Sequence, residues 1–565
     1  MASVQNNRAP LHLPTLPDVG NEVNVVESTL ASGDVVETQT TSYRWPLRIS
    51  VVILIALAII WRAVGITNWP TPFHRTLQYE SAITTRTIHL HLRGDRTPVE
   101  QAWVEGGHWR ITSPPVLTSM TALLYLVVGE EPWMAYLLNL FAWLIAGYCL
   151  YRAGRHLTGD GVTPLFGLMW FWLHPYGIKL TQSFQPESLL LMGFTCSLWL
   201  MTRPNSLQSY RTTILVAVAC SLAALVKPGV LILPLVFAFA AHCLTLATLA
   251  WKERLARLGL FTLIVAIPSI VYVFTAMKDQ IDGRFMPQLL TQSQYYQHAM
   301  LQFRTAIGIV PLILGLAGTL VATYRGRYWL LGAFIGYLGY MAVFSWHTAS
   351  HDYYHAPLMV LVSFGMMELA RLVIHAIPLL KINFLNGTPV SAIVLVSVAC
   401  TLLFIPAIQL KMKSLKQDWQ GLWLLDPHIK TLVALEREST RQEIAVERAI
   451  GERLGPTADV ICMDNTNYGL GIEYNGGVRT VQYWPTTAED YAYLSQNNRI
   501  PYSHETYMNA ILTKTKYAYF VVTNMVAFER DNAMGFEDQF LKAYRYRRLP
   551  DWDNPRAIIW ERLKK

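Results

Sequence analysis

The sequence predicts a polytopic α-helical membrane protein with a small α/β domain at its C-terminal end. Apolar residues make up 52% of the 565-residue chain and charged residues only 15%, whereas an average soluble protein has roughly 25% charged residues. The apolar residues gather in long uncharged runs between residues 46 and 411, and residues 412–565 have a mixed composition. These observations exclude a soluble enzyme, a disordered scaffold and a nucleic-acid binder.

The basic residues lie mainly beside the apolar runs. The chain has 46 Lys and Arg against 38 Asp and Glu, a formal net charge of +8. Cytoplasmic loops of membrane proteins carry an excess of Lys and Arg, so we interpret this charge as membrane topology rather than affinity for an acidic partner. No two of the six cysteines stand at C-x-x-C spacing. The cysteine pattern therefore predicts neither a disulfide framework nor a metal site.

Residues 1–45 are polar and acidic without an apolar run, which predicts a flexible cytoplasmic tail rather than a cleaved signal. Residues 46–411 are expected to form the transmembrane domain, since a crossing needs ~20 apolar residues. The predicted spans are 47–66, 133–151, 162–180, 187–202, 212–227, 228–250, 258–277, 305–323, 328–346, 356–376 and 389–410, eleven in all. With the N-terminus inside, every second connection is cytoplasmic, and these connections carry the basic residues. They are Arg152/Arg155, Arg203/Arg211, Lys252/Arg254/Arg257, Arg325/Arg327 and Arg371/Lys381.

One apolar run is too short to cross. A helix over residues 115–129 would be only about 22 Å long, and counting it as a span would move every later basic connection outside. We therefore predict a helix in the membrane interface, with Trp103, Trp109 and Trp133 as interfacial anchors. The first outer loop then runs from about residue 67 to 132, a length that is unusual for a mere connector.

The odd number of crossings places residues 412–565 on the outer side. Residues 428–454 form an amphipathic pattern rich in Glu and Arg, and 460–463 and 517–522 are typical of short buried strands. The Asn-Gly-Gly sequence at 475–477 indicates a turn. This length suits one small α/β domain.

Two of four polar groups on the predicted outer side centre on a glutamate. In the first loop, residues 74–81 contain Glu80, with Arg75 before it and Arg86 after it at helical spacing. Glu80 could act as a general base or simply pair with either arginine. In the next outer connection, Glu187 follows Gln185 and Pro186 where a helix begins, a position that the helix dipole favours for any carboxylate.

The other two groups are basic and aromatic. Lys227 precedes Pro228 between two apolar runs, where a lysine must snorkel to water or meet an anion such as a lipid phosphate. Residues 345–357 hold three histidines, an aspartate and two tyrosines. His347, His351 and His355 could line one helix face as metal ligands. We favour an irregular loop whose donors bind an anionic group beside an aromatic wall.

The order of these motifs resembles that of the GT-C superfamily of membrane glycosyltransferases, in particular the protein O-mannosyltransferase and aminoarabinose transferase branch. The motifs are Tyr79-Glu80, Ser113-Pro114-Pro115 with the interfacial helix ending at Gly129, Gln185-Pro186-Glu187, Lys227-Pro228-Gly229 and His351-Asp352-Tyr353-Tyr354. The resemblance covers roughly residues 45–410. The family commonly has an adjacent Asp-Glu pair in the first loop, where this chain has Tyr79-Glu80, so Glu80 is the one acid left for the base role.

The resemblance implies an enzyme that takes a sugar from a polyprenyl-phosphate lipid and transfers it to an acceptor hydroxyl by an inverting single displacement. Glu80 would deprotonate the acceptor, and Glu187 would orient the acceptor or the donor sugar, or assist Glu80. Lys227, together with Arg75 or Arg86 and with His351, would neutralise the lipid phosphate. Tyr353 and Tyr354 would pack on the donor or hydrogen-bond to it.

No cofactor is expected. A divalent metal remains an option that we do not favour, because Glu80 and Glu187 are too few carboxylates to hold one. The expected partners are the lipid-linked donor, an acceptor of unknown class and the bilayer. The expected location is a bacterial plasma membrane, with the N-terminus cytoplasmic and the site extracytoplasmic.

Three alternatives stay open. One is a metal-dependent oligosaccharyl transferase. A secondary transporter would show inverted repeats and broken helices with charges near the bilayer midplane, and the sequence shows neither. A non-catalytic membrane subunit would leave Glu80, Glu187 and the His-Tyr loop without a role.

Overall fold

The computed structural model describes residues 44–63, 66–71, 73–106, 113–203, 206, 209–245, 249–276, 286–322, 324–376, 427–464, 467–486, 513, 517–552 and 554–563. The chain divides into two units, Met1–Ile53 and Leu54–Lys565. Every candidate site residue lies in the second unit. Residues 1–43 of the predicted tail, the predicted span 389–410 and Trp109 lie outside the described residues.

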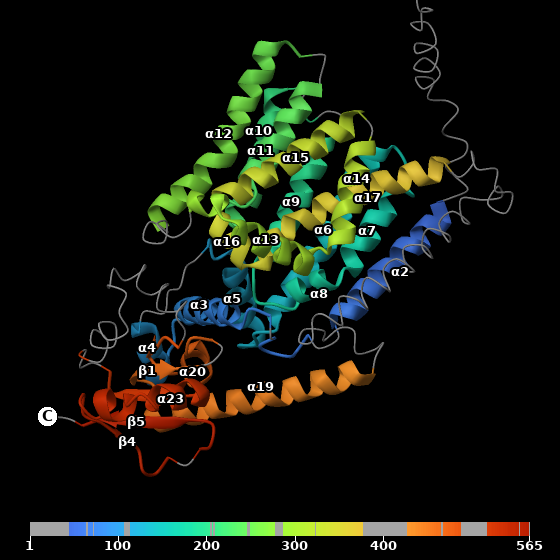
Figure 1. Cartoon of the computed structure of the whole chain (residues 1–565). Helices are drawn as coiled ribbons and strands as arrows, with labels where there is room; N and C mark the ends of the chain where they lie inside the picture. The colour runs from blue at the N-terminus through green and yellow to red at the C-terminus, as the bar shows by residue number, and fades with distance from the viewer. Residues whose placement is uncertain are drawn as a thin grey trace, which may run out of the picture. The chain divides into compact units, whose positions relative to one another are not determined.

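Helices dominate the chain up to residue 376 (Figure 1). They are α2 (Arg44–Ala63), α3 (Arg75–Arg93), α4 (Pro98–Glu105), α5 (Val116–Val128), α6 (Met134–Thr158), α7 (Pro164–Leu173), α8 (Pro175–Thr181), α9 (Glu187–Thr202), α10 (Tyr210–Val226), α11 (Ile232–Thr245), α12 (Trp251–Ala276), η2 (Pro287–Thr291), α13 (Ser293–Ala306), α14 (Ile309–Val321), α15 (Tyr324–Val343), α16 (Ser345–Ser350), η3 (Asp352–His355) and α17 (Ala356–Ala376). Each predicted span within the described residues coincides with a helix or a pair of helices.

Three stretches of the described chain are long and apolar enough to cross a membrane, namely Met134–Thr158, Trp251–Ala276 and Asp352–Ile374. The pair α13 and α14 passes the same test together, but it bends by 90° at its break. Other predicted spans are shorter apolar helices, such as Glu187–Thr202 and Tyr210–Val226. These lengths and compositions are those of an integral membrane protein.

Two predicted spans are interrupted, which corrects the expectation of unbroken helices. The span 162–180 breaks between α7 and α8, where Pro175 follows His174 and cannot continue the preceding helix. The span 305–323 breaks between α13 and α14 at Gly308, whose φ of +90° favours glycine. The carbonyl of Ile307, next to this break, lies 3.1 Å from His174 Nε2. The two breaks therefore meet inside the bundle.

Small residues let some helices touch backbone to backbone. A Cβ on Gly318 of α14 would lie 1.8 Å from the carbonyl oxygen of Gly365 in α17, and a Cβ on Gly365 would lie 1.9 Å from that of Gly315. Helices in lipid commonly associate through such glycine contacts, because close approach gains van der Waals packing. The contact of α14 with α17 thus depends on these three glycines.

Within the first loop, the helix predicted for 115–129 is present as α5. Trp103, however, is only 3% exposed, with the Arg86 guanidinium 4.9 Å from the centre of its ring. It is a core residue rather than an interfacial anchor. Helix α3 packs against both α5 and the later helix α20 (Leu470–Asn475).

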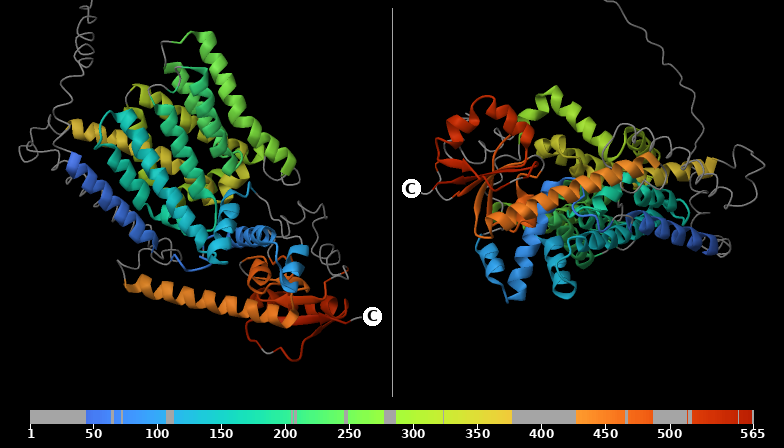
Figure 2. Two further views of the ribbon diagram at one scale, coloured as in Figure 1. Left: turned by 180° about the vertical axis from the view of Figure 1, so that it is seen from behind. Right: turned by 90° about the horizontal axis from the view of Figure 1, so that it is seen from below.

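The C-terminal part, defined here as the described residues between 427 and 563, contains helix α19 (Pro427–Leu454), helix α20, helix α23 (Met525–Asn532), a π-helical turn η6 (Glu537–Leu541) and a five-stranded sheet (orange and red in Figure 2). The strands are β1 (Asp459–Met463), β2 (Thr480–Tyr483), β3 (Tyr519–Val522), β4 (Tyr546–Arg548) and β5 (Ile558–Arg562), in the order β2-β1-β3-β5-β4. Strand β1 pairs in parallel with β2 and β3, while β5 runs antiparallel to β3 and β4. The predicted helix at 428–454 and both predicted strands are present.

Alternation along β1 places apolar side chains on both faces of this sheet. Ile461 and Met463 pack with Phe520 and Trp560 in one cluster, while Val460 and Cys462 belong to another cluster on the opposite face. Asn475 ends α20, and Gly477 follows with a φ of +66°, which accounts for the predicted turn.

We expect Gly365→Ala to lower the unfolding temperature in detergent, because the added methyl group overlaps Gly315 and overpacking costs about 1–3 kcal/mol. Gly259→Ala in α12 is the matched control, since nothing lies within 4 Å of a Cβ there. The control should be neutral or slightly stabilising. Equal unfolding temperatures for the two variants would show that the glycine contact does not matter.

Candidate active site

Glu187 and Lys227 form a buried ion pair between two helices that the sequence separates by 40 positions. Glu187 opens α9 after Pro186, and Lys227 caps the C-terminal end of α10. Lys227 Nζ lies 2.6 Å from Glu187 Oε1, and the two side chains are 14% and 1% exposed. Glu187 Oε2 is buried and accepts no hydrogen bond from the part of the chain that the structure describes. One carboxylate oxygen is therefore left for a further donor.

Two tyrosines form a wall beside this pair. Lys227 Nζ lies 4.1 Å from the ring centres of both Tyr353 and Tyr354, which places the ammonium group in cation–π contact with each ring. The turn after Lys227 approaches closely because Gly229 adopts a φ of +94°, and a Cβ there would lie 2.4 Å from the Phe344 ring. The Lys-Pro-Gly motif is thus shaped to bring the ammonium group under the tyrosines.

Glu80 reaches the same cluster from helix α3. Its half-buried carboxylate is, with Glu187, among the charges that act on the Tyr353 hydroxyl. The structure thus brings together five of the predicted site residues: Glu80, Glu187, Lys227, Tyr353 and Tyr354.

His74 and Asp352 join this site, although neither was predicted as a site residue. His74 Nε2 lies 2.8 Å from Asp352 Oδ1, and Tyr353 packs edge-on against the imidazole with a centroid distance of 4.8 Å. His74 caps α3 in a left-handed conformation with φ of 47°. The pair thus ties the start of α3 to the His-Asp-Tyr-Tyr segment. Asp352 stands within the His-Asp-Tyr-Tyr motif and His74 begins the polar stretch 74–81, but their 278-residue separation hid the contact.

His351 lies at the edge of the cluster. Its ring centre is 5.2 Å from that of Tyr353 and 6.2 Å from that of His74, and its Nδ1 lies 2.6 Å from the Ser350 hydroxyl. Burial, together with electrostatic repulsion from His74 and Lys227, lowers the pKa of His351 to about 4. At neutral pH this imidazole is therefore a neutral hydrogen-bonding group, and its expected part in binding the lipid phosphate stays a prediction.

The three histidines of this segment do not share one helix face. Helix α16 ends at Ser350 and a 3₁₀ turn follows from Asp352. His355 is buried between the Tyr337 hydroxyl at Nδ1 and the Thr348 carbonyl, 2.8 Å from Nε2. Within the described ranges, no three His, Cys, Asp or Glu side chains are grouped so that they could hold a metal ion. The alternative of a histidine metal site finds no support in this arrangement.

Arg75 and Arg86 are engaged outside this cluster. Arg75 donates to Glu443 at 2.7 Å and to Thr440 at 2.8 Å, both on α19. Arg86 lies 2.7 Å from Glu130 and donates to the Tyr474 carbonyl at 2.6 Å. The expectation that one of them joins Lys227 at an anion therefore does not match their hydrogen bonds.

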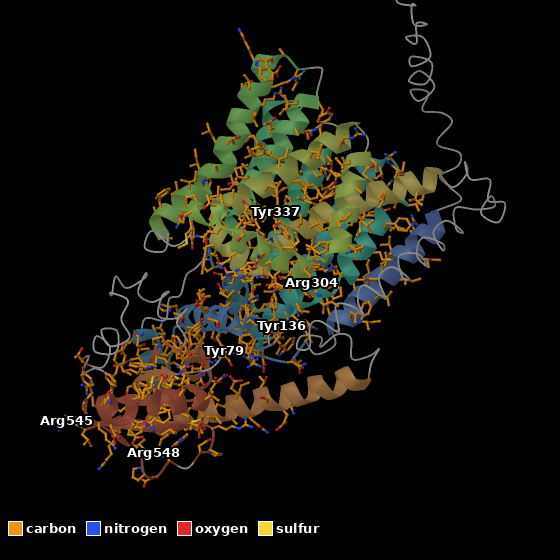
Figure 3. All side chains as sticks on the ribbon, in the orientation of Figure 1. Tyr79, Tyr136, Arg304, Tyr337, Arg545 and Arg548 are labelled. Carbon is orange, nitrogen blue, oxygen red and sulfur yellow. The ribbon has the colours of Figure 1, made fainter. Side chains whose placement is uncertain are left out.

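Tyr79 also turns away from the cluster. It lies on α3 where that helix meets the C-terminal part (Figure 3). Tyr136 of α6 lies on the bundle side and donates to Gln78 of α3 at 2.8 Å. Asn475 Nδ2 donates to the Tyr79 hydroxyl at 3.0 Å and to Glu447 at 2.7 Å. Burial and the charges of Glu447 and Glu443 raise the pKa of Tyr79, so its hydroxyl stays protonated. Tyr79 therefore does not replace a missing acid.

Glu447 is a buried carboxyl at the centre of this second network. It accepts from Asn475 and, at 3.3 Å, from Asn467. Burial, and to a lesser degree the charges of Glu443 and Asp464, raises the pKa of Glu447 to about 8. The group is therefore mostly protonated at neutral pH.

Solved structures similar to this chain are membrane glycosyltransferases. ArnT, the aminoarabinose transferase, from Cupriavidus metallidurans bound to undecaprenyl phosphate has a TM-score of 0.55 and 14% identity, over 90% of this chain and 97% of that chain. Its apo state has a TM-score of 0.52 with the same identity and coverage. The Archaeoglobus fulgidus oligosaccharyltransferase tethered with an acceptor peptide has a TM-score of 0.50 and 10% identity, over 93% and 75% of the two chains. No family model and no curated protein sequence matches.

Both of these proteins are GT-C glycosyltransferases. The similarity extends over about nine-tenths of the chain. At these identities the likeness shows a common fold. The predicted GT-C architecture is confirmed at that level.

We expect Lys227→Met to destabilise the protein strongly. The substitution leaves the Glu187 carboxylate buried without its cation, and breaking a buried pair in this way typically costs about 3–5 kcal/mol. The double variant K227M/E187Q should recover most of the loss, because no buried charge remains. Thermal unfolding in detergent measures both effects. A single variant that unfolds at the wild-type temperature would show that the pair is not buried as described.

We expect Glu447→Gln to stabilise the protein increasingly as pH rises from about 5 to 8.5. The folded-state pKa of about 8 lies above the ordinary glutamate value of 4.5, so the folded state holds this proton more tightly than the unfolded state. Stability from this group is fully present below about 4.5 and is lost as pH approaches 8, at no more than about 1.4 kcal/mol per pH unit.

The measurement is the difference in unfolding temperature between the E447Q variant and wild type across that pH range. Glu452→Gln, on the exposed side of the same helix, is the control and should show a flat difference. A flat difference for E447Q as well would mean that Glu447 is ionised in the folded protein at neutral pH.

Proposed function

Starting from the GT-C fold, we propose that this protein is a membrane glycosyltransferase that moves a sugar from a polyprenyl-phosphate donor to an acceptor hydroxyl. One observation carries the proposal: the Glu187–Lys227 pair, the Tyr353–Tyr354 wall and Glu80 converge from four separate segments onto one place. The ArnT structure with undecaprenyl phosphate supports the lipid class, since a protein of this fold there binds a polyprenyl phosphate.

Lys227 is the proposed binding group for the lipid phosphate. An ammonium group has three donors, and one of them is directed at Glu187. The other two can meet phosphate oxygens, where a fixed positive charge stabilises the negative charge that develops on the leaving group. Glu187 in this proposal orients Lys227 through Oε1, and its second oxygen, Oε2, is left to orient the acceptor or the donor sugar.

The tyrosines and His351 complete the proposed donor site. Tyr353 and Tyr354 keep Lys227 in an aromatic environment, where an electrostatic interaction with phosphate is stronger than in water. They would pack on the donor or hydrogen-bond to it. His351 would contribute a neutral imidazole as a hydrogen-bond donor.

Glu80 is the proposed general base. The hydroxyl of an acceptor has a pKa far above 7, so it needs a positioned base as it attacks the sugar carbon. In a single displacement the carbon–oxygen bond to the acceptor forms while the bond to the phosphate oxygen breaks, which inverts the anomeric carbon. Base and leaving phosphate must then lie on opposite sides of the sugar. In this proposal Glu80 on α3 would act on one side of the sugar and Lys227 at the end of α10 on the other.

The membrane arrangement proposed with this function has eleven crossings within residues 46–411. The tail 1–45 is placed in the cytoplasm, and residues 412–565 form an extracytoplasmic α/β domain beside the site. The basic residues in alternate connections support this orientation. A bacterial plasma membrane is the proposed location.

We expect Glu80→Gln to reduce kcat by about 10²–10⁴-fold, because it removes general-base catalysis while it preserves the size of the side chain. Binding of the polyprenyl phosphate should be nearly unchanged. The assay follows transfer from labelled polyprenyl-phosphate sugars to candidate acceptors by the purified protein in lipid nanodiscs.

Glu131→Gln is the control in the same loop, because Glu131 is exposed and its carboxylate accepts a hydrogen bond from the Trp133 indole. It should retain wild-type turnover. Full transfer activity in the E80Q variant would end the assignment of Glu80 as the base.

A further inference from the structure

Helix α3 presents different sides to the candidate site and to the C-terminal part. Arg75, Tyr79 and Arg86 recur at spacings of four and seven, so they share one face of the helix. Each of them hydrogen-bonds to the C-terminal part. Glu80 comes one residue after Tyr79, so its side chain leaves the helix about 100° away around the axis, and its charge acts on Tyr353.

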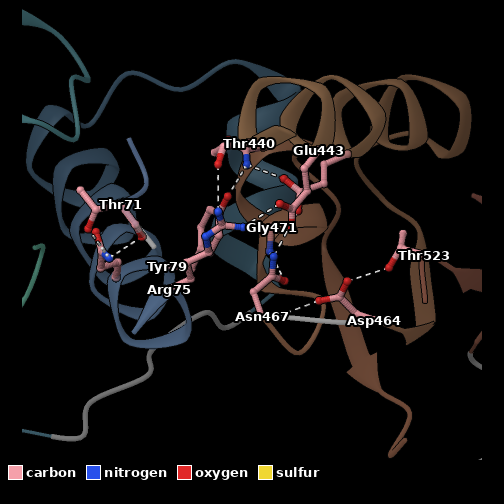
Figure 4. Close-up of polar contacts among 12 residues, drawn as sticks. Thr71, Arg75, Tyr79, Thr440, Glu443, Asp464, Asn467, Gly471 and Thr523 are labelled. Carbon is pink, nitrogen blue, oxygen red and sulfur yellow. Dashed lines mark hydrogen bonds and ion pairs between the residues drawn. The ribbon is translucent and has the colours of Figure 1, made fainter. Parts of the chain in front are cut away.

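The first of these contacts lies at the start of α3. Arg75 donates to Glu443 at 2.7 Å and to Thr440 at 2.8 Å, and Figure 4 shows it reaching across to both residues of α19. The Arg75 and Glu443 side chains are 15% and 31% exposed. A partly buried ion pair with a second hydrogen bond is directional, so it restricts rotation of α3 about its axis.

The second contact is made by Tyr79, the residue next to Glu80. Its ring is 2% exposed, and its hydroxyl accepts from Asn475, which is held in turn by Glu447. An aspartate at position 79 would place a carboxylate opposite Glu443 and Glu447, both of which already act on the Tyr79 hydroxyl. This contact therefore explains why the chain has Tyr-Glu in place of Asp-Glu: Tyr79, the first residue of the pair, hydrogen-bonds to the C-terminal part.

The third contact lies about two turns beyond Tyr79. Arg86 donates to the Tyr474 carbonyl at 2.6 Å, and its guanidinium lies 3.9 Å from the centre of the Tyr474 ring. Glu130 binds both Arg86, at 2.7 Å, and the Tyr474 hydroxyl, at 2.8 Å. With contacts at its first residue, in its first half and just beyond its middle, α3 can neither rotate nor slide without breaking several of them.

We infer that the C-terminal part positions the base: its contacts with Arg75, Tyr79 and Arg86 fix the rotation of α3 and thereby hold the Glu80 carboxylate at its distance from Lys227 and Tyr353. The inference rests on the proposed function. Arg75, Glu443, Tyr79 and Asn475 are positioning residues here, since they act through α3 and not on the substrate. A displacement of about 1 Å at a reacting group can cost 10²-fold in rate, so modest loosening of α3 should be visible in kcat.

A charge exchange between Arg75 and Glu443 tests this inference. Arg75→Glu and Glu443→Arg each place like charges opposite one another, and each should lower kcat by at least about tenfold with little change in polyprenyl-phosphate binding. The double variant R75E/E443R restores an opposite-charge pair and should recover most of the activity. Hydrogen–deuterium exchange of the α3 backbone amides should quicken in both single variants and return toward wild type in the double variant.

The matched control swaps the charges of the Arg479–Asp459 pair, whose atoms lie 2.6 Å apart within the C-terminal part. It should leave kcat and the hydrogen–deuterium exchange of α3 unchanged. If Arg75 bound the lipid phosphate itself, the double variant would stay inactive, and that result would overturn the inference. Unchanged hydrogen–deuterium exchange of α3 in the single variants would also overturn the inference, whatever their transfer activity. If wild type transfers no sugar, the proposed function fails, and the exchange data alone still decide whether the C-terminal part holds α3.

Discussion

A carboxylate that leaves water at the start of an apolar helix must be matched by a cation, and the candidate site is organised by that requirement. Glu187 is 1% exposed, and Lys227 supplies the matching charge at 2.6 Å from the end of a different helix. The pair brings α9 and the end of α10 together beneath Tyr353 and Tyr354. A buried pair of this kind contributes little net stability, which favours a functional reason for its presence. An anion that takes up the free donors of Lys227 is such a reason.

Helix α3 is the element that connects this site with the rest of the chain. His74 ties its first turn to Asp352, Gln78 receives a hydrogen bond from Tyr136 of the bundle, and Tyr79 receives one from the C-terminal part. The first loop is therefore a packed structural element that carries Glu80, which explains why this loop is so long.

Much of the helical arrangement could be predicted, because crossing a bilayer constrains length and hydropathy. The predicted spans 187–202 and 356–376 coincide with α9 and α17. The breaks at His174 and Gly308 were missed, since a hydropathy window averages over the proline or glycine that ends a helix. The short strands β2, β4 and β5 were also missed, because segments of three to five residues carry too little periodicity.

The candidate site was predictable in its residue types but not in its pairing. The motifs identified Glu187, Lys227 and Tyr353, yet sequence spacing could not show that Glu187 binds Lys227. Sequence spacing also could not distinguish a phosphate-binding arginine from one that pairs with a carboxylate. Arg75 and Arg86 both pair with carboxylates. Contacts between residues far apart in the chain, such as His74 with Asp352, depend on the folded arrangement alone.

The most direct test of the account is an electron cryomicroscopy structure of the protein in nanodiscs with a polyprenyl phosphate bound. The account predicts phosphate density within hydrogen-bonding distance, about 3 Å, of Lys227 Nζ and beside the Tyr353 and Tyr354 rings, with the lipid chain extending along the apolar helices. Phosphate density at Arg75 or Arg86, or at the opposite end of the bundle, would contradict it.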